Sequence, residues 1–168
     1  MKMSTITNRT TPIGLVNYAK DFFDCAIIAD EHMGQQPGYE IIAPIPVMYL
    51  AGHSIELCLK AYLLFKEVPY IDLKSKKYGH DLTICLDKAN ELGLCAQVYL
   101  TDGEYIALSA LNNLYSTTEL SYIKTGEKEF PVFGPIQSVC SKLLNAIYPL
   151  VNSDDKKQQD YLYYESYC

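Results

Sequence analysis

Residues 41–66 read IIAPIPVMYLAGHSIELCLKAYLLFK, and this stretch decides the fold. It is nearly all apolar, so a helix formed from it must be buried on most sides. His53, Glu56 and Lys60 interrupt it at a spacing that places them on one narrow helical face, and Tyr49 joins that face one turn earlier. Because an unpaired buried charge is costly, this polar stripe needs partners elsewhere in the chain. Glu56 precedes Lys60 by four residues, the favourable order for an ion pair along a helix.

Size and composition indicate one globular domain with a hydrophobic core. The chain has 168 residues, of which 49% are apolar and 20% are charged. The net charge is -6 and the sole arginine is Arg9, which counts against a large basic surface for nucleic acid but leaves a small local contact open. Charges break the best candidate for a membrane span, and the N-terminus has no apolar signal core. We therefore expect a cytoplasmic protein that does not contact a membrane.

The six cysteines indicate neither a metal site nor a redox site. No two of them have C-x-x-C spacing, and most lie in apolar helical segments. We expect free thiols that are mostly buried and act as small hydrophobic groups, without disulfides. The six are Cys25, Cys58, Cys85, Cys95, Cys140 and Cys168.

The remaining periodicity predicts an all-α, up-and-down bundle of about five helices. Asp81 is a good N-cap for a short third helix that Gly93 ends, and Thr101 with Glu104 forms a capping box at the start of a fourth. The predicted helices are 13–33, Pro46 to about Phe65 or Lys66 after an irregular lead-in, the segment between Asp81 and Gly93, 102–115, and 135–151.

We divide the chain into a flexible N-terminal segment, 1–12, a single helical domain, 13–152, and a polar, tyrosine-rich C-terminal tail, 153–168. The tail is either mobile or docked on a partner. The connection 67–79 contains Lys74, Lys76 and Lys77. We interpret it as a solvated loop, with a phosphate-facing loop as the alternative.

Two motifs together resemble the HEPN superfamily, which comprises small α-helical bundle domains of prokaryotic toxin–antitoxin and phage-defence systems. They are SIELCLKAYLL and, after a loop with a basic cluster, GHDL. The later segments LNNLYSTTELSYIKTG and FPVFGPI are similar to the C-terminal part of stand-alone bacterial HEPN proteins. The resemblance covers roughly residues 13–150, and its sharpest residues are Glu56, Leu59, Lys60, Gly79, His80, Asp81 and Leu82.

The resemblance implies one of two functions. Many HEPN domains are metal-independent endoribonucleases that dimerise and use an R-x(4–6)-H motif, whereas others lack it and act as binding or dimerisation modules. Here no histidine follows Arg9 at that spacing, and Ser121 occupies the position where an arginine is expected. Because lysine is a poor substitute for the bidentate guanidinium fork, the usual nuclease site does not carry over to this chain.

The GHDL motif has two interpretations. In the first, Asp81 caps the third helix and His80 hydrogen-bonds the second. In the second, His80 joins the polar stripe in a pocket that binds a nucleotide or cleaves RNA. No nucleotide-binding or serine-hydrolase motif is present, and we expect neither a metal nor another cofactor. The catalytic candidates are His80, His53 and Lys60, and the binding candidates are Glu56, Lys60, His80, Asp81 and Tyr49.

Three hypotheses follow. The first is a non-catalytic HEPN-like module that forms a homodimer and binds a protein partner or a nucleic-acid or nucleotide ligand, in a prokaryotic defence or toxin–antitoxin context. The second is a metal-independent endoribonuclease with a non-standard site. The third is a structural helical adaptor whose C-terminal tail docks on another protein. The absent arginine motif and the acidic charge favour the first.

Overall fold

The computed structural model describes residues 10–39, 41–122 and 129–165, with side chains as far as Ser153. The described residues form helices and turns without a strand, so the predicted all-α fold is confirmed. The helices are α1 (Pro12–Met33), α2 (Ile45–Phe65), α3 (Tyr70–Leu73), α4 (Leu82–Glu91), the 3₁₀ helix η1 (Leu94–Ala96), α5 (Asp102–Tyr115) and α6 (Phe133–Glu165).

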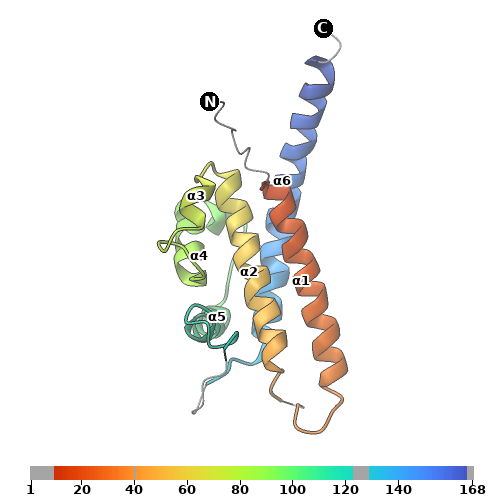
Figure 1. Ribbon diagram of the computed structural model, residues 1–168, viewed down its shortest axis with the longest axis vertical. Helices are drawn as coiled ribbons and strands as arrows, with labels where there is room; N and C mark the ends of the chain where they lie inside the picture. Colours follow the sequence, from red (N-terminus) through yellow and green to blue (C-terminus); the bar gives the residue numbers. More distant parts are fainter. Residues whose placement is uncertain (1–9, 40, 123–128, 166–168) are drawn as a thin grey trace, which may run out of the picture.

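The long helices α1, α2 and α6 lie side by side, and the shorter elements lie on one flank of α2 (Figure 1). Helix α2 contacts α1, α4, α5 and α6, which makes it the central element of the bundle. Figure 1 views α5 down its axis while α2 runs vertically, so α5 crosses α2 instead of lying antiparallel to it.

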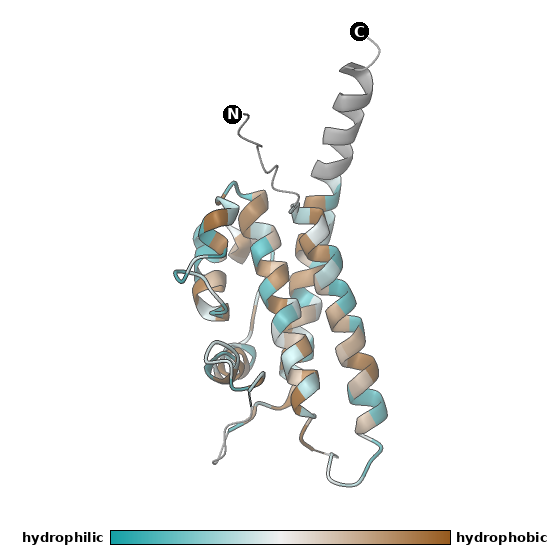
Figure 2. Cartoon of the chain, in the orientation of Figure 1, coloured by the Kyte–Doolittle hydropathy of each residue, from teal (hydrophilic) through white to brown (hydrophobic). Residues whose placement is uncertain are grey.

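Helix α2 is buried on most sides, as its composition predicts. Apolar residues recur along α1, α2 and α6 between hydrophilic ones (Figure 2). Ile55, Leu59 and Leu63 of α2 are fully buried. The hydroxyl of Ser54 donates to the carbonyl oxygen of Ala19 over 2.7 Å, which joins α2 directly to the α1 backbone. Burial of these aliphatic side chains is the main force that holds the bundle together.

The predicted helix signals act as expected at three termini. Asp81 accepts hydrogen bonds from the backbone N–H groups of Thr83 and Ile84 and so caps α4. Thr101 and Glu104 form the predicted capping box of α5. Gly93 has φ 97°, a left-handed conformation that favours glycine, just after α4 ends.

Two helix boundaries differ from the prediction. Helix α3 occupies part of the predicted connection, as a single turn that begins after Pro69. Helix α6 passes Val151 and continues to Glu165 with Pro149 inside it. Residues 152–165 contain neither glycine nor proline, so nothing in that segment interrupts the helix.

The predicted flexible segment, 1–12, and the predicted tail, 153–168, fall partly outside the described residues. Thr11 caps α1 and Pro12 is its first residue, so the first helix begins within the N-terminal segment. Residues 1–9 and 166–168 lie outside the described ranges. The division into three parts stays a prediction.

The cysteine prediction is confirmed at three positions and wrong at two. Cys58, Cys85 and Cys140 are buried, whereas Cys25 and Cys95 are exposed. All five are free thiols, and Cys168 lies outside the described residues. Cys25 lies on the outer face of α1, which its helical context alone does not reveal.

Candidate functional site

The polar stripe of α2 converges on the carboxylate of Glu56. The ammonium group of Lys60, one helical turn later, donates to Oε1 of Glu56 over 2.5 Å. Nδ1 of His53, one turn earlier, lies 3.6 Å from Oε2. The Glu56 side chain is 5% exposed, so these neighbours replace water around a buried charge.

The GHDL turn packs against the same carboxylate from another part of the chain. Nδ1 of His80 lies 3.0 Å from Oε2 of Glu56, and Lys60 donates to the carbonyl oxygen of Gly79 over 2.6 Å. Gly79 has φ 47°, a backbone conformation that glycine adopts without strain. The predicted contact between His80 and the polar stripe of α2 is therefore confirmed.

Helix α5 completes the cluster with two residues that the sequence did not single out. The phenol of Tyr115 donates to Oε2 of Glu56 over 2.5 Å. Asn112, one turn earlier, accepts from the backbone N–H of Leu82 over 2.7 Å and donates to Oδ1 of Asp81 over 3.1 Å. Both side chains lie on the buried face of α5. The sequence offered one signal for Tyr115: a tyrosine on the buried face of a helix needs a hydrogen-bond partner for its hydroxyl.

Tyr115 can approach α2 because residue 52 is a glycine. A Cβ atom built on Gly52 would lie 2.7 Å from Cδ2 of Tyr115, closer than real Cβ contacts. Any larger residue at this position would force the ring away from Glu56. Gly52 therefore positions the phenol, although it makes no polar contact itself.

The hydrogen-bond donors determine which imidazole nitrogens carry protons. An ionised carboxylate only accepts, so His80 donates to Glu56 through Nδ1–H. Tyr115 gives its single proton to Glu56, so its oxygen accepts from Nδ1–H of His53 over 2.9 Å. In both rings Nε2 is then the acceptor of the neutral form. Among the described residues, no hydrogen bond to either Nε2 is formed.

Electrostatics favour the ionised form of Glu56. Burial alone raises the pKa of this carboxyl, but the nearby imidazole of His53, the charge of Lys60 and the hydrogen bonds from Lys60 and Tyr115 hold the pKa well below its ordinary value. Burial, the nearby Glu56 charge and the hydrogen bond to it raise the pKa of Tyr115. The carboxylate is therefore charged and the phenol neutral at physiological pH.

Exposure separates the cluster into a buried base and an accessible rim. The His80 side chain is 59% exposed and that of His53 is 26% exposed, whereas that of Lys60 is 11% exposed. Tyr49 stacks on His53 with ring centroids 6.1 Å apart and also lines a neighbouring hollow of about 370 Å³. The two imidazoles are therefore the groups of this cluster that a ligand can reach.

Two other candidate chemistries find little support. Burial raises the pKa of the neighbouring Cys85 thiol to about 12, so it is a poor nucleophile. In the described ranges, no group of three or more His, Cys, Asp or Glu side chains is placed to hold a metal ion.

The basic connection is exposed and lies next to the cluster in sequence. Lys74, Lys76 and Lys77 all face solvent. The ammonium groups of Lys74 and Lys77 lie over the rings of Tyr70 and Tyr78, respectively. The solvated loop and the phosphate-facing loop both stay compatible with this position.

A second polar cluster joins α5 to α6. Glu104 accepts hydrogen bonds from Lys142 over 2.7 Å and from Ser138 over 2.6 Å, beside its capping contacts with Thr101. Burial raises the pKa of Glu104, but these donors lower it to about 2. Glu104 is buried and both of its carboxylate oxygens accept hydrogen bonds from these donors, so we assign this cluster to structure.

Comparison with known proteins places the chain in no family. No family model matches it, and neither a curated protein nor a solved structure is significantly similar to it. Across the described residues, each helix is too short or too polar to cross a membrane.

Proposed function

We propose that this chain is a HEPN-like helical module that binds a phosphate-bearing ligand, a nucleotide or a nucleic acid, on the surface formed by His53 and His80. The observation that carries the proposal is the pair of imidazoles held through Nδ1 by Glu56 and Tyr115. Among the described residues, neither Nε2 has a hydrogen-bond partner, so the protonated form can donate from this atom to a phosphate oxygen.

The fixed orientation of the rings supports binding. A surface histidine normally loses rotamer freedom when it contacts a ligand, which weakens affinity. Here the buried carboxylate holds His80 and the phenol holds His53 before any ligand arrives. The stacked ring of Tyr49 next to His53 offers an aromatic surface for a base.

The environment of Lys60 favours binding over catalysis. RNA cleavage without a metal benefits from a cation that stabilises the charge developing at the phosphate. The Lys60 ammonium group is engaged by Glu56 and by the Gly79 carbonyl, and its side chain is nearly buried. The sole arginine, Arg9, lies outside the described residues. Among the described residues, the cluster thus contains a base and an acid but no accessible lysine or arginine.

Titration with a fluorescein-labelled single-stranded RNA of mixed sequence tests the proposal. We expect the H53A/H80A double variant to bind at least tenfold more weakly than wild type, and wild type to bind more tightly at pH 6 than at pH 8 because imidazolium attracts phosphate. The matched control is His32→Ala, an exposed histidine at the end of α1. Equal affinity of wild type and the double variant, for this RNA and for AMP, would overturn the proposal.

A metal-independent endoribonuclease is the second candidate, and the same two imidazoles favour it. One neutral and one protonated imidazole can act as general base and general acid at a 2′-hydroxyl and a leaving oxygen. Incubation of a structured RNA with the protein in EDTA separates the two proposals. Cleavage by wild type that His80→Ala abolishes and His32→Ala preserves would establish the enzyme; its absence alongside binding would support the module.

The biological context and the assembly rest on the HEPN resemblance. We propose a symmetric homodimer in a prokaryotic defence or toxin–antitoxin system, with a possible protein partner encoded by a neighbouring gene. A single monomeric species in light scattering at working concentration would contradict the dimer.

A further inference from the structure

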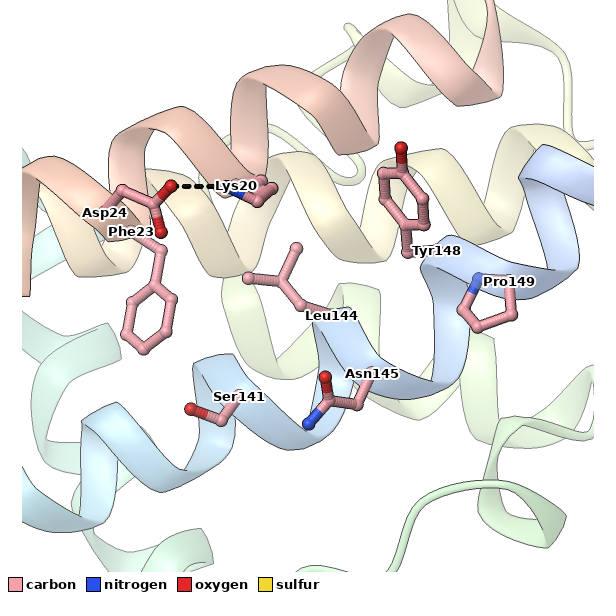
Figure 3. A pocket seen from close by; sticks show the side chains of 8 residues that line it. All are labelled: Lys20, Phe23, Asp24, Ser141, Leu144, Asn145, Tyr148 and Pro149. Carbon is pink, nitrogen blue, oxygen red and sulfur yellow. Dashed lines mark hydrogen bonds and ion pairs between the residues drawn. The ribbon is translucent and has the colours of Figure 1, made fainter.

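The described lysines of this acidic chain fall into a paired group and an unpaired group. In the paired group each ammonium group lies 2.5 to 2.8 Å from a carboxylate oxygen. Figure 3 shows one such pair, Lys20 with Asp24, beside a hollow between α1 and α6. The paired lysines are Lys20, Lys60, Lys88 and Lys142. A carboxylate next to the ammonium group largely cancels its attraction for an anionic ligand.

Every other lysine whose side chain the structure describes lies between the end of α2 and the start of α4 (Figure 1). We call this group the lysine stretch; it consists of Lys66, Lys74, Lys76 and Lys77, which are all exposed. Within the described part of the chain none of the four forms an ion pair, although Glu67 and Asp72 belong to the same connection. In a chain of net charge -6, the described lysines that are open to an anion are thus gathered in one place.

Aromatic rings, instead of carboxylates, hold three of these ammonium groups. The Nζ atom of Lys74 lies 4.9 Å from the ring centroid of Tyr70, and that of Lys77 lies 5.3 Å from the centroid of Tyr78. Lys66 makes similar contacts with two rings of α2. A ring attracts a cation through its quadrupole and leaves the net charge in place. These ammonium groups are therefore positioned and still available to a phosphate.

The backbone that carries the lysine stretch is fixed to the body of the protein. Leu73 and Tyr78 are buried and anchor the connection in the core. The N–H of Gly79 donates to the carbonyl oxygen of Ser75 over 2.8 Å, and the carbonyl oxygen of Gly79 accepts from Lys60 of α2 over 2.6 Å. A connection held in this way loses less conformational entropy on binding than a mobile loop does. These contacts favour the phosphate-facing interpretation of the connection over the solvated loop.

The lysine stretch leads to His80. Lys77 precedes His80 by three residues, so their Cα atoms are at most about 11 Å apart. At the other end, Lys66 lies about 9 Å along the axis of α2 beyond Lys60, the residue that contacts the turn of His80. A single phosphate group is too small to contact every member of a stretch of this extent. Successive phosphates of a nucleic-acid strand can do so.

We infer that a single-stranded nucleic acid binds with its phosphodiester backbone along the lysine stretch and with one phosphate at His80. The inference rests on the function proposed for His53 and His80 and extends its ligand from one phosphate to a strand. A single strand suits the site better than a duplex, because the ring of Tyr49 beside His53 can stack on an unpaired base. An anionic membrane suits it less, because Ile71 is the one large exposed apolar side chain of residues 66–80.

The salt dependence of binding tests this inference. Fluorescence anisotropy follows the binding of short fluorescein-labelled RNA and DNA strands of one mixed sequence, between about 50 and 200 mM salt. Each lysine that neutralises a phosphate of a single strand adds about 0.7 to the steepness with which log affinity falls with log salt concentration. The K74Q/K76Q variant should therefore reduce this steepness by about 1.4 and weaken binding about tenfold or more at the lowest salt. Both strands should respond alike, because the contacts are to phosphates.

Two controls separate the lysine stretch from net charge and from the histidine site. Lys20→Glu changes the net charge as much as K74Q/K76Q does, but at a lysine that is already paired with Asp24. It should leave the salt dependence unchanged. AMP carries a single phosphate group for the histidine site, so wild type and K74Q/K76Q should bind AMP equally well. Retained AMP binding also shows that K74Q/K76Q is folded.

The inference is overturned if K74Q/K76Q has the salt dependence of wild type, or if Lys20→Glu changes it equally. It is also overturned if wild type binds AMP but neither strand, or if the two lysines affect binding to phosphatidylserine vesicles and not to the strands. These outcomes leave the function proposed for the histidines standing. Equal binding of the strand and of AMP by wild type and H53A/H80A would instead overturn that function.

Discussion

The phenol of Tyr115 donates a 2.5 Å hydrogen bond to Glu56, a residue 59 positions earlier in the chain. The bond joins α5 to α2 at a buried carboxylate that also accepts hydrogen bonds from His80 and Lys60. Three segments distant in sequence thus meet at one charged group. The candidate site depends on this convergence, and its parts can be tested singly.

Tyr115→Phe should destabilise the fold by about 1.5–3 kcal/mol, because it removes a hydrogen bond to a buried charge and keeps the ring. Urea denaturation measures the change. Tyr105→Phe is the control, since Tyr105 lies on the same helix with an exposed side chain. Equal stability of the two variants would show that the phenol contributes nothing to the fold.

Gly52→Ala should destabilise by about 1–3 kcal/mol, because the new methyl group overlaps the Tyr115 ring. Combination with Tyr115→Leu should cost less than the sum of the two single changes, since the residues are in contact. Gly103→Ala is the control: a Cβ there meets nothing within 4 Å. Because Gly103 lies in a helix, Gly103→Ala should leave the stability of the fold unchanged or increase it. If Gly103→Ala destabilised the fold as much as Gly52→Ala does, overlap with the Tyr115 ring would not explain the effect at Gly52.

Glu56→Gln should destabilise by about 3–5 kcal/mol, because it leaves the nearly buried Lys60 ammonium without its counter-charge. Adding Lys60→Met to Glu56→Gln should recover part of this loss, since the uncompensated charge disappears. Thermal unfolding of the two single variants and the double variant measures the coupling. Strict additivity of the two changes would contradict a buried ion pair.

Stability should fall in acid through Glu56 and Glu104. Both have a folded-state pKa below the ordinary value of 4.5, with that of Glu104 near 2. Their contribution is therefore complete above about pH 4.5 and is lost as the pH falls towards 2. Urea midpoints at pH 7 and pH 3 measure the loss. Glu104→Gln should weaken the pH dependence of stability, whereas Glu31→Gln, at an exposed position, should leave it unchanged. If the two variants show the same pH dependence, Glu104 does not contribute to the loss of stability in acid.

Local sequence signals determined much of the secondary structure. The apolar run of α2, the cap at Asp81 and the capping box at Thr101 each rely on residues within a few positions of one another. The shared helical face of His53, Glu56 and Lys60 was predictable from the sequence for the same reason, because the spacing of residues on a face is set by the helix itself. One boundary error arose because the polar stretch after Val151 was assigned to a tail, although it continues α6, and the other because Pro69 was missed as the start of a helix.

Only the tertiary structure decided which residues contact the polar stripe of α2. Tyr115 and Asn112 look like ordinary positions on the buried face of α5, and nothing local connects them to Glu56 or Asp81. Their contacts depend on the angle at which α5 crosses α2, and that angle follows from packing of the whole core, including the missing side chain at Gly52. Sequence periodicity assigns a residue to a face of a helix, whereas the packing of distant helices decides what that face meets.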